Sequence, residues 1–487
     1  MRLNYFVRFI AVAAVLLLAS CGGGGGSSSS TPASNTVQAA PTISISLTPA
    51  SITSAQTSTL AWSTTNATTC TASGDWSGAK ATSGGQSVSQ ITLGTFVYVF
   101  GLDCSGPGGS ASSSATLTIT PVVSNSVPIV LDGGSAGASP PAFNTPFVSV
   151  TICVPGTATC QTIDHVILDT GSTGLRLIQP GVVSLSLPQV LSSSNNALAE
   201  CAVFADGFTW GAVRSADIKL AGEVALNTPI ETIGENPGGV AVIPADCSGT
   251  GPNKSSAASL GAKGILGVGL FANDCDACKL SVIAATYYSC PVSGCVGTMV
   301  TSSQVIPNPV ALFPQDNNGV VVALPAVGNT GAKSPSGSLI FGIGTQANNV
   351  LGSATVYATN TSTGRFFTTY KGIRKASFID SGSNGIFFAD ATIAQCTLSI
   401  GFYCPASPLA LTATNAAASG VASSVVNFSV VSVDGLGTGV TVGNAGGTLS
   451  NLSSQFDWGI PFFFGRKVFT AIKGAATTAG QGPYWAY

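Results

Sequence analysis

Apolar and polar residues alternate along short stretches of the chain, most regularly over residues 42–47 and 114–119. A period of two places successive side chains on opposite faces of a strand, so each stretch predicts a β-strand with one buried face. Both stretches lie between residues 41 and 120, a segment that also contains Cys70 and Cys104. We therefore expect residues 41–120 to form one β-rich module.

Two other stretches are apolar without alternation and run directly into an aspartate. Residues 166–168 precede Asp169, and residues 378–379 precede Asp380; a hydroxyl residue, Gly, Ser and, two residues later, another Gly follow each acid. This pattern predicts a buried strand that ends in a tight turn. A single copy is explained by an Asp that caps its own turn. Two copies in matching contexts predict two buried carboxylates that meet, because an isolated buried charge is costly.

The composition predicts an all-β protein. Only 7% of the 487 residues are charged, and 59 are glycine. Abundant Ser and Thr beside Val, Ile and Phe suit many short strands joined by turns. The length exceeds what one hydrophobic core usually supports, so we expect about two to four domains.

The charged residues exclude several function classes. The net charge is −2 and no basic cluster occurs, so nucleic acid is not an expected partner. His165 is the single histidine, which excludes multi-histidine metal sites and leaves one possible base for a Ser-His-Asp triad. It lies four residues before Asp169, where we expect it to pack or hydrogen-bond at a strand start. We expect neither a metal nor another cofactor.

The N-terminus has the features of a secretory signal. Arg2 and Arg8 precede the apolar run 9–18, and small residues lead to Cys21. This end resembles the lipobox of bacterial lipoproteins, in which such a cysteine is acylated and becomes the mature N-terminus. An ordinary signal peptide, 1–20, with an unrelated cysteine is the alternative. The glycines and serines that follow suit a flexible tether over 21–40. The resemblance implies a lipid-anchored protein of the bacterial cell envelope, and Gly after Cys21 is compatible with the outer membrane.

The paired Asp loops resemble those of the pepsin-like aspartic peptidases. The resemblance implies a bilobal, double-barrel domain over residues 127–487, with an N-terminal lobe over about 127–330 and a C-terminal lobe over about 331–487. Asp169 and Asp380 would activate a water molecule that hydrolyses a peptide bond in an extended peptide or protein substrate. Neither metal nor cofactor is implied.

Four further segments resemble the same family in the expected order. Residues 204–211 are similar to the flap hairpin that closes over substrate, and residues 263–269 to the apolar segment beside the first Asp loop. Residues 336–344 resemble the strand that opens the second lobe, and residues 458–469 the corresponding segment of that lobe.

The resemblance also implies roles for individual residues. Thr170 and Ser381 would brace the two loops across the site, while Ser172 and Ser383 would hydrogen-bond the outer carboxylate oxygens. The remaining positions implied in the loops or in the flap are Gly171, Gly382, Phe204, Asp206, Gly207 and Trp210.

Two positions depart from the family pattern. Phe204 stands where pepsins carry Tyr, and Arg176 stands where a Trp is expected. The hydrogen bond that steadies a closed flap is therefore missing, and Trp210 is a candidate partial substitute. If Arg176 points inward, it would lower the pKa of Asp169. The alternative to an endopeptidase is a catalytically silent pepsin-like lipoprotein for binding or envelope assembly; an all-β adhesin leaves the paired Asp loops unexplained.

The module at 41–120 resembles bacterial immunoglobulin-like domains with an internal disulfide. Such a β-sandwich commonly serves as a spacer. We expect it to act as a stalk.

Twelve cysteines remain when Cys21 is set aside, an even number that argues for disulfides in an exported chain. Local spacing suggests the pairs Cys70 with Cys104, Cys153 with Cys160, Cys201 with Cys247 and Cys396 with Cys404. Cys275, Cys278, Cys290 and Cys295 allow three connectivities. A nested ladder across an antiparallel turn is the simplest of these, a redox pair of Cys275 with Cys278 is another, and a four-thiolate zinc site is disfavoured.

Overall fold

The computed structural model describes residues 38–53, 56–90, 95–120, 124–134, 142–328, 331–436, 440–448 and 454–487. The chain divides into two compact units, the first ending at Val122 and the second running from Val123 to Tyr487. Within the described ranges, no helix has both the length and the apolar character needed to cross a membrane. Cys21, the signal 1–20 and most of the tether 21–40 lie outside the described residues.

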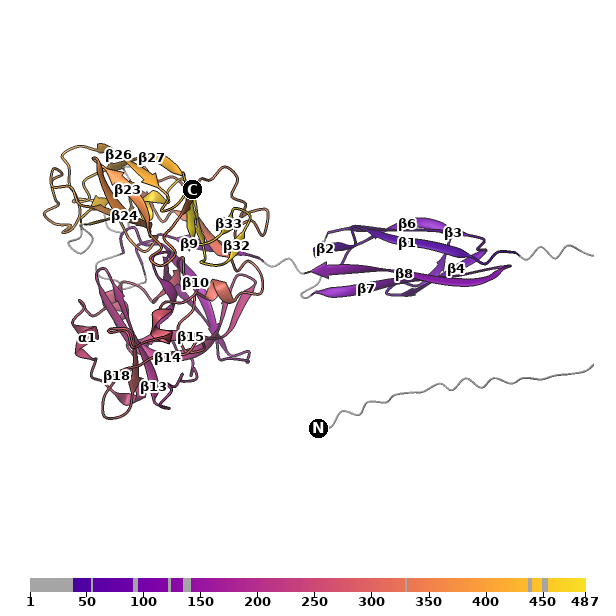
Figure 1. Ribbon diagram of the computed structural model, residues 1–487, viewed down its shortest axis with the longest axis horizontal. Helices are drawn as coiled ribbons and strands as arrows, with labels where there is room; N and C mark the ends of the chain where they lie inside the picture. The colour runs from indigo at the N-terminus through magenta and orange to yellow at the C-terminus, as the bar shows by residue number, and fades with distance from the viewer. Residues whose placement is uncertain are drawn as a thin grey trace, which may run out of the picture. The chain divides into compact units, whose positions relative to one another are not determined.

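The first unit consists of two β-sheets (Figure 1). The three-stranded sheet has the order β1-β3-β6 and the five-stranded sheet the order β2-β8-β7-β4-β5. Their bounds are β1 Thr42–Thr48, β2 Ser51–Thr53, β3 Ser58–Thr65, β4 Thr69–Gly74, β5 Gly78–Lys80, β6 Ser83–Val88, β7 Phe96–Gly106 and β8 Gly109–Thr120. Leu47, Leu60, Leu102 and Leu117 lie in the common core, so the predicted alternation does separate a buried face from an exposed one.

The second unit is built around a 15-stranded sheet with the order β18-β17-β13-β14-β15-β12-β16-β11-β10-β9-β21-β19-β31-β34-β22. Ten of its strands lie within residues 126–297, namely β9 Ser126–Val130, β10 Phe147–Cys153, β11 Cys160–Asp169, β12 Thr173–Ile178, β13 Ala197–Phe204, β14 Gly207–Leu220, β15 Glu223–Ile233, β16 Gly264–Val268, β17 Tyr287–Cys290 and β18 Val296–Gly297. The other five are β19 Gly319–Ala323, β21 Ser336–Phe341, β22 Val356–Ala358, β31 Lys467–Ala471 and β34 Tyr484–Ala486.

A seven-stranded sheet with the order β27-β26-β23-β24-β30-β25-β29 forms the other lobe. Its strands are β23 Phe366–Tyr370, β24 Ile373–Ile379, β25 Ile386–Phe388, β26 Leu409–Ala416, β27 Ser423–Val430, β29 Gly446–Gly447 and β30 Gln455–Trp458. In Figure 1, β13, β14 and β18 lie at one end of this unit, and β23, β26 and β27 lie at the other.

The remaining elements are short. Two-stranded sheets pair β20 Ala332–Lys333 with β28 Val440–Thr441 and β32 Ala476–Thr477 with β33 Gly480–Gln481. The α-helices are α1 Ala245–Ser248 and α2 Ala257–Leu260, and the 3-10 helices are η1 Pro237–Gly239, η2 Ala277–Lys279, η3 Pro309–Leu312 and η5 Ile460–Phe462. The all-β prediction is confirmed, since each of the two α-helices in the described ranges has only four residues.

The strands that lead to the two Asp loops are buried for the reason that the sequence suggests. The apolar end of β11 lies between β10 and β16, and β24 lies between β23 and β30. Val166, Leu168 and Ile379 contribute to one core cluster that extends through both lobes. The loops therefore start from fixed points in the middle of two sheets.

Four of the predicted disulfides are present, namely Cys70–Cys104, Cys153–Cys160, Cys201–Cys247 and Cys396–Cys404. The first joins neighbouring strands of one sheet, because Cys70 lies opposite Cys104 in the pairing of β4 with β7.

The nested ladder expected for the other four cysteines is wrong. Cys275 pairs with Cys278, and Cys290 pairs with Cys295. The turn that leads into η2 brings the first two within a Cα separation of 5.4 Å. The strand β17 forms its hairpin with β18, which places Cys290 opposite Cys295 rather than beside the 275–278 turn.

Candidate active site

The two Asp loops hold each other through reciprocal hydrogen bonds. The Thr170 amide donates to the Ser381 hydroxyl at 3.0 Å, and the Ser381 amide donates to the Thr170 hydroxyl at 2.9 Å. Each hydroxyl then donates to the carbonyl at the end of the opposite strand, Thr170 to Ile379 at 3.1 Å and Ser381 to Leu168 at 2.7 Å. Both side chains are fully buried, so these bonds are shielded from competing water.

Each carboxylate is bonded within its own loop in the same way. The Gly171 amide donates to Asp169 Oδ1 at 2.7 Å, and the Ser172 hydroxyl donates to Asp169 Oδ2. In the second loop the Gly382 amide donates to Asp380 Oδ1 at 2.8 Å, and the Ser383 hydroxyl donates to Asp380 Oδ2 at 2.9 Å. The outer oxygens therefore face serines, and the inner oxygens face the opposite loop.

The two carboxyl groups meet at the centre of this arrangement. A Cβ atom added to Gly171 would lie 2.6 Å from Asp380 Cγ, and one added to Gly382 would lie 2.9 Å from Asp169 Cγ. Glycine is required at both positions because each carboxyl rests against the opposite loop. Burial raises the pKa of Asp380 well above its ordinary value, and the charge of Asp169, to which Asp380 is hydrogen-bonded, raises it further.

A cavity of about 300 Å³ lies beside the first Asp loop, between Ser172 and Phe204. Phe204 ends β13, which forms a hairpin with β14 through the pairing of Phe204 with Gly207. Asp206 lies at the exposed tip of this hairpin and forms an ion pair with Lys254 at 2.9 Å. The structure thus brings Phe204 to the Asp169 loop and leaves Asp206 on the surface.

Trp210 is placed elsewhere. It is buried against Tyr288, with ring centroids 5.2 Å apart, in a core cluster with Cys201 and Cys247. Its indole nitrogen has no hydrogen-bond partner among the described residues. The suggestion that Trp210 substitutes for the flap hydrogen bond is therefore wrong, because the hairpin turns this side chain into its own core.

Arg176 points into a cluster of acids rather than toward Asp169. It donates from Nη2 to Glu200 at 2.5 Å and from Nε to Glu200 at 3.1 Å, and it lies 3.5 Å from Glu231 and 3.6 Å from Asp274. Burial alone would lower the pKa of Arg176, but the surrounding carboxylates raise it above its ordinary value. The condition that Arg176 points toward Asp169 is therefore not met, because its guanidinium is bonded to Glu200.

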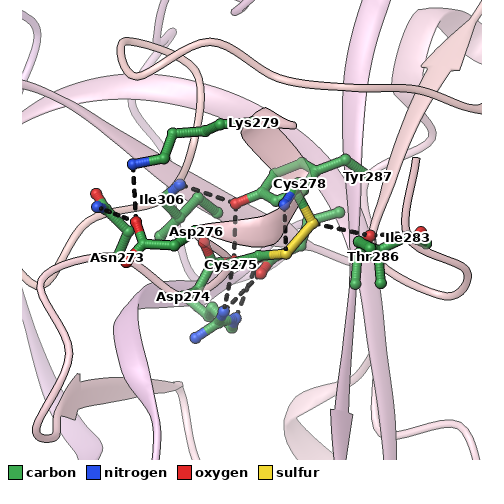
Figure 2. The surroundings of a disulfide bond; sticks show 12 residues. Asn273, Asp274, Cys275, Asp276, Cys278, Lys279, Ile283, Thr286, Tyr287 and Ile306 are labelled. Atoms are coloured by element: carbon green, nitrogen blue, oxygen red, sulfur yellow. Dashed lines mark hydrogen bonds and ion pairs between the residues drawn. A yellow bond between two sulfur atoms is a disulfide. The ribbon is translucent and has the colours of Figure 1, made fainter. Parts of the chain in front are cut away.

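Arg176, Glu200 and Asp274 of this cluster line the cavity, and Asp274 lies beside the Cys275–Cys278 disulfide (Figure 2). Asp274 accepts a hydrogen bond from the Tyr287 hydroxyl at 2.7 Å, and that hydroxyl accepts one from the Ile306 amide at 2.8 Å. The adjacent Cys275–Cys278 disulfide fixes the turn that carries Asp274. Burial, and then the charge of Glu200, raise the pKa values of Asp274 and Glu231. The cluster therefore joins four separate segments around one guanidinium.

Two residues near the Asp pair were not recognised from the sequence. Asp457 is completely buried in β30, and Arg365 precedes β23 with its guanidinium 3.8 Å from the centre of the Phe378 ring. Both acids of the pair and Asp457 lie within electrostatic range of one another. The signal was present, since Asp457 stands directly between the aromatic residues Phe456 and Trp458 of β30.

His165 forms hydrogen bonds with Asp164 at 3.0 Å and with Asp132 at 3.1 Å, at the surface.

In the part of the chain that the structure describes, one group of three potential metal ligands occurs, Cys396, Cys404 and Asp434. Its two sulfurs form a disulfide, and Asp434 accepts hydrogen bonds from the backbone of residues 397–399. These three residues therefore close a loop and do not form a metal site.

The chain is similar to an aspartic proteinase from Irpex lacteus of known crystal structure, with 16% sequence identity, a TM-score of 0.42, and coverage of 74% of this chain and 96% of that chain. No curated protein matches the sequence. Residues 121–487 match the family described as "Protein of unknown function (DUF3443)". This match includes both Asp loops and the whole second unit, and the chain belongs to the DUF3443 family.

Proposed function

We propose that this protein is an aspartic-type endopeptidase in which Asp169 and Asp380 activate a water molecule for peptide hydrolysis. The observation that carries the proposal is the reciprocal bonding of Thr170 and Ser381, which holds two carboxyl groups against each other between the lobes. Two carboxyls in contact cannot both ionise, so they share one proton.

Because the two carboxyl groups share one proton, they have different roles in the reaction. Asp380, whose pKa is raised, is the acid that keeps the proton, and Asp169 is the base. Asp169 takes a proton from water as the water oxygen attacks the peptide carbonyl, while Asp380 donates its proton to the carbonyl oxygen. The C–N bond of the resulting tetrahedral intermediate breaks when the proton on Asp169 passes to the amine nitrogen, while one hydroxyl of the intermediate returns its proton to Asp380 and becomes the new carbonyl oxygen. No covalent enzyme intermediate is involved.

The substrate would lie extended beside the β13–β14 hairpin, whose end is next to Ser172. Main-chain pairing with a strand edge would hold the peptide in register. One side chain of the substrate would enter the cavity between Phe204 and the Asp169 loop.

We further propose that Cys21 anchors the protein to the outer membrane of a bacterial envelope, and that the first unit is an immunoglobulin-like stalk.

The test is hydrolysis of casein and of a peptide library by the full chain in detergent, from acid to neutral pH, with and without pepstatin. Pepstatin-sensitive cleavage that both Asp169→Asn and Asp380→Asn abolish supports the proposal. Peptide binding without cleavage by the wild-type protein would instead support the alternative of a silent binding or envelope-assembly lipoprotein.

A further inference from the structure

The Cys275–Cys278 disulfide lies at the cavity and has one accessible sulfur. Cys275 is partly exposed and lines the cavity beside the first Asp loop, whereas Cys278 is fully buried. Of the six disulfides among the described residues, this one closes the shortest loop, with a sequence separation of 3 against 5 to 46 for the others. A bond that closes a short loop restricts the unfolded chain least, so its cleavage should leave the fold in place.

Both sulfurs already have the hydrogen-bond partners that reduced cysteines need (Figure 2). The Cys278 amide donates to Cys275 Sγ at 3.1 Å, and the same bond would stabilise a thiolate on Cys275. Cys278 Sγ lies 3.3 Å from Oγ1 of Thr286, whose hydroxyl hydrogen is donated to the Ile283 carbonyl at 2.7 Å. Thr286 Oγ1 can therefore only accept from Cys278, which requires a thiol hydrogen that a disulfide lacks. Both contacts thus stabilise the reduced pair.

The turn that this disulfide closes is connected to the Asp169 loop. Asp274 directly precedes Cys275, and its carboxylate lies 3.6 Å from Arg176 Nη2. Arg176 Nη1 in turn donates to the Thr173 carbonyl at 2.8 Å, and Thr173 begins β12 directly after the Asp169 loop. A change in the turn can therefore reach both the wall of the cavity and the residue that follows this loop.

We propose that Cys275–Cys278 is a thiol–disulfide exchange site for a dithiol reductant, and that its redox state controls the cavity. A thiolate of the dithiol attacks Cys275 Sγ to form a mixed disulfide, and the bond between the two cysteines breaks, so that Cys278 leaves as a thiolate. The second thiolate of the dithiol attacks its own sulfur in the mixed disulfide and releases Cys275 as a thiolate. The dithiol is oxidised by two electrons to a disulfide; one of its two protons passes to Cys278 and the other to solvent.

The exchange itself is independent of the proposed function, whereas its effect on catalysis rests on that function. In the oxidised protein the disulfide fixes the turn that carries Asp274 and one wall of the cavity. After reduction the turn loses this covalent link, so a peptide side chain in the cavity should be bound more weakly. The oxidised protein is therefore the form that binds peptide more tightly.

The first test measures which disulfides open. The full chain in detergent is equilibrated in buffers of reduced and oxidised dithiothreitol, quenched with acid, alkylated and digested for mass spectrometry. We expect Cys275 and Cys278 to be alkylated at reductant ratios that leave Cys201–Cys247, a pair with both cysteines buried, closed, and the far-UV circular dichroism to be unchanged. Opening of the reference pair first, or loss of the fold when Cys275–Cys278 opens, would overturn the proposal.

Variants of Thr286 test whether its hydroxyl stabilises the reduced pair. Thr286→Val removes the acceptor, so its redox equilibrium with dithiothreitol should move roughly twofold to tenfold toward the disulfide. Thr286→Ser keeps the hydroxyl and is the matched control, which should stay at the wild-type equilibrium. A valine variant with the wild-type equilibrium would contradict the assigned role of this contact.

Single-cysteine variants test which sulfur is attacked. The Cys275 thiol in Cys278→Ser should react with a dithionitrobenzoate reagent about tenfold or more faster than the Cys278 thiol in Cys275→Ser, because Cys275 is accessible and has a donor for its thiolate. Equal rates for the two thiols would exclude Cys275 as the point of attack.

Peptide cleavage gives the readout for the cavity. Reduction of the wild-type protein should raise the KM for a peptide by roughly fivefold or more, and the double variant Cys275→Ser, Cys278→Ser should show the same rise without reductant. An unchanged KM in both would overturn control of the cavity by this pair. If the oxidised wild-type protein does not cleave peptides, the proposed function fails; the alkylation data then decide the exchange site, and peptide binding by the two redox forms decides its effect on the cavity.

Discussion

Thr170 and Ser381 are 211 residues apart in sequence, yet each donates its backbone amide to the hydroxyl of the other. This exchange ties together two loops that belong to different sheets. It sets the separation of the two acids, because each acid directly precedes one of the bonded residues.

Replacing Thr170 with Val should destabilise the protein and impair hydrolysis. Valine has the shape of threonine but leaves the buried Ser381 amide without an acceptor, which costs about 1–3 kcal/mol. Chemical denaturation measures the free energy of unfolding. Thr151→Val, which removes a hydroxyl from a surface pair with Thr162, is the matched control and should change it by less than about 0.5 kcal/mol. Equal losses in the two variants would contradict the bracing role.

Either Asp169→Asn or Asp380→Asn should reduce hydrolysis by about a hundredfold to ten-thousandfold, because a pair with one acid can no longer divide the roles of acid and base. The fold should persist, since Asn has the shape of Asp, its amide oxygen can accept the hydrogen bond from the Gly amide, and its amide nitrogen can donate to the Ser hydroxyl. Far-UV circular dichroism and peptide binding serve as controls. Substantial turnover in either variant would show that the pair is not the catalytic group.

Replacing Arg176 with Leu should destabilise the protein by about 3–5 kcal/mol, because Glu200 would be left buried without its partner. The double variant Arg176→Leu, Glu200→Leu should recover much of this loss. Arg214→Leu is the comparison, since its ion pair with Glu235 is more exposed and should contribute only about 1 kcal/mol. Additive losses in the double variant would argue against coupling of Arg176 with Glu200.

The stability of the wild-type protein should fall as the pH rises between 3.8 and about 8, in part because of Asp457. Its pKa is raised in the fold, so the folded state binds a proton that the unfolded state has released, and unfolding becomes easier with each step in pH. The contribution is at most about 1.4 kcal/mol per pH unit. Denaturant titrations at several pH values should show that the free energy of unfolding depends less steeply on pH in Asp457→Asn than in the wild-type protein. An unchanged dependence would mean that Asp457 is ionised in the folded protein.

Cys21→Ser should abolish labelling of the protein by palmitate in a bacterial host and release it from the membrane fraction. The reason is that a charged segment, an apolar run and small residues precede Cys21 in the order of a lipoprotein signal. Equal labelling of the two proteins would exclude lipidation at this cysteine.

The parts of the site that could be predicted are those that a short sequence pattern determines. An apolar strand that runs into Asp-Thr-Gly-Ser determines its own turn, so Asp169 and its bonding partners were accessible from one stretch of chain. The partners of Arg176 were not, because Glu200, Glu231 and Asp274 come from three other segments that only the completed sheet brings together.

Asp457 was missed for the opposite reason. The resemblance covered residues 458–469 and stopped one residue short of this acid, which the structure places inside the buried strand β30. A charged residue in a central strand conflicts with its local pattern, and such conflicts mark functional positions more often than exposed charges do. The pairing of Cys275 with Cys278 was considered but not preferred, because four cysteines within one region do not reveal which strand forms the hairpin.

The position of β9 has a consequence for how the protein folds. Ser126–Val130 is the first strand of the second unit to be synthesised, yet it pairs with β21, which begins at Ser336. Contacts this distant in sequence slow folding, and the edge of β9 stays unpaired until the later strand has emerged. A nascent or truncated chain that lacks β21 should therefore bind a holdase chaperone. The two acids come together later still, because the bonds that brace their loops need Ser381, which lies beyond β21 in the chain.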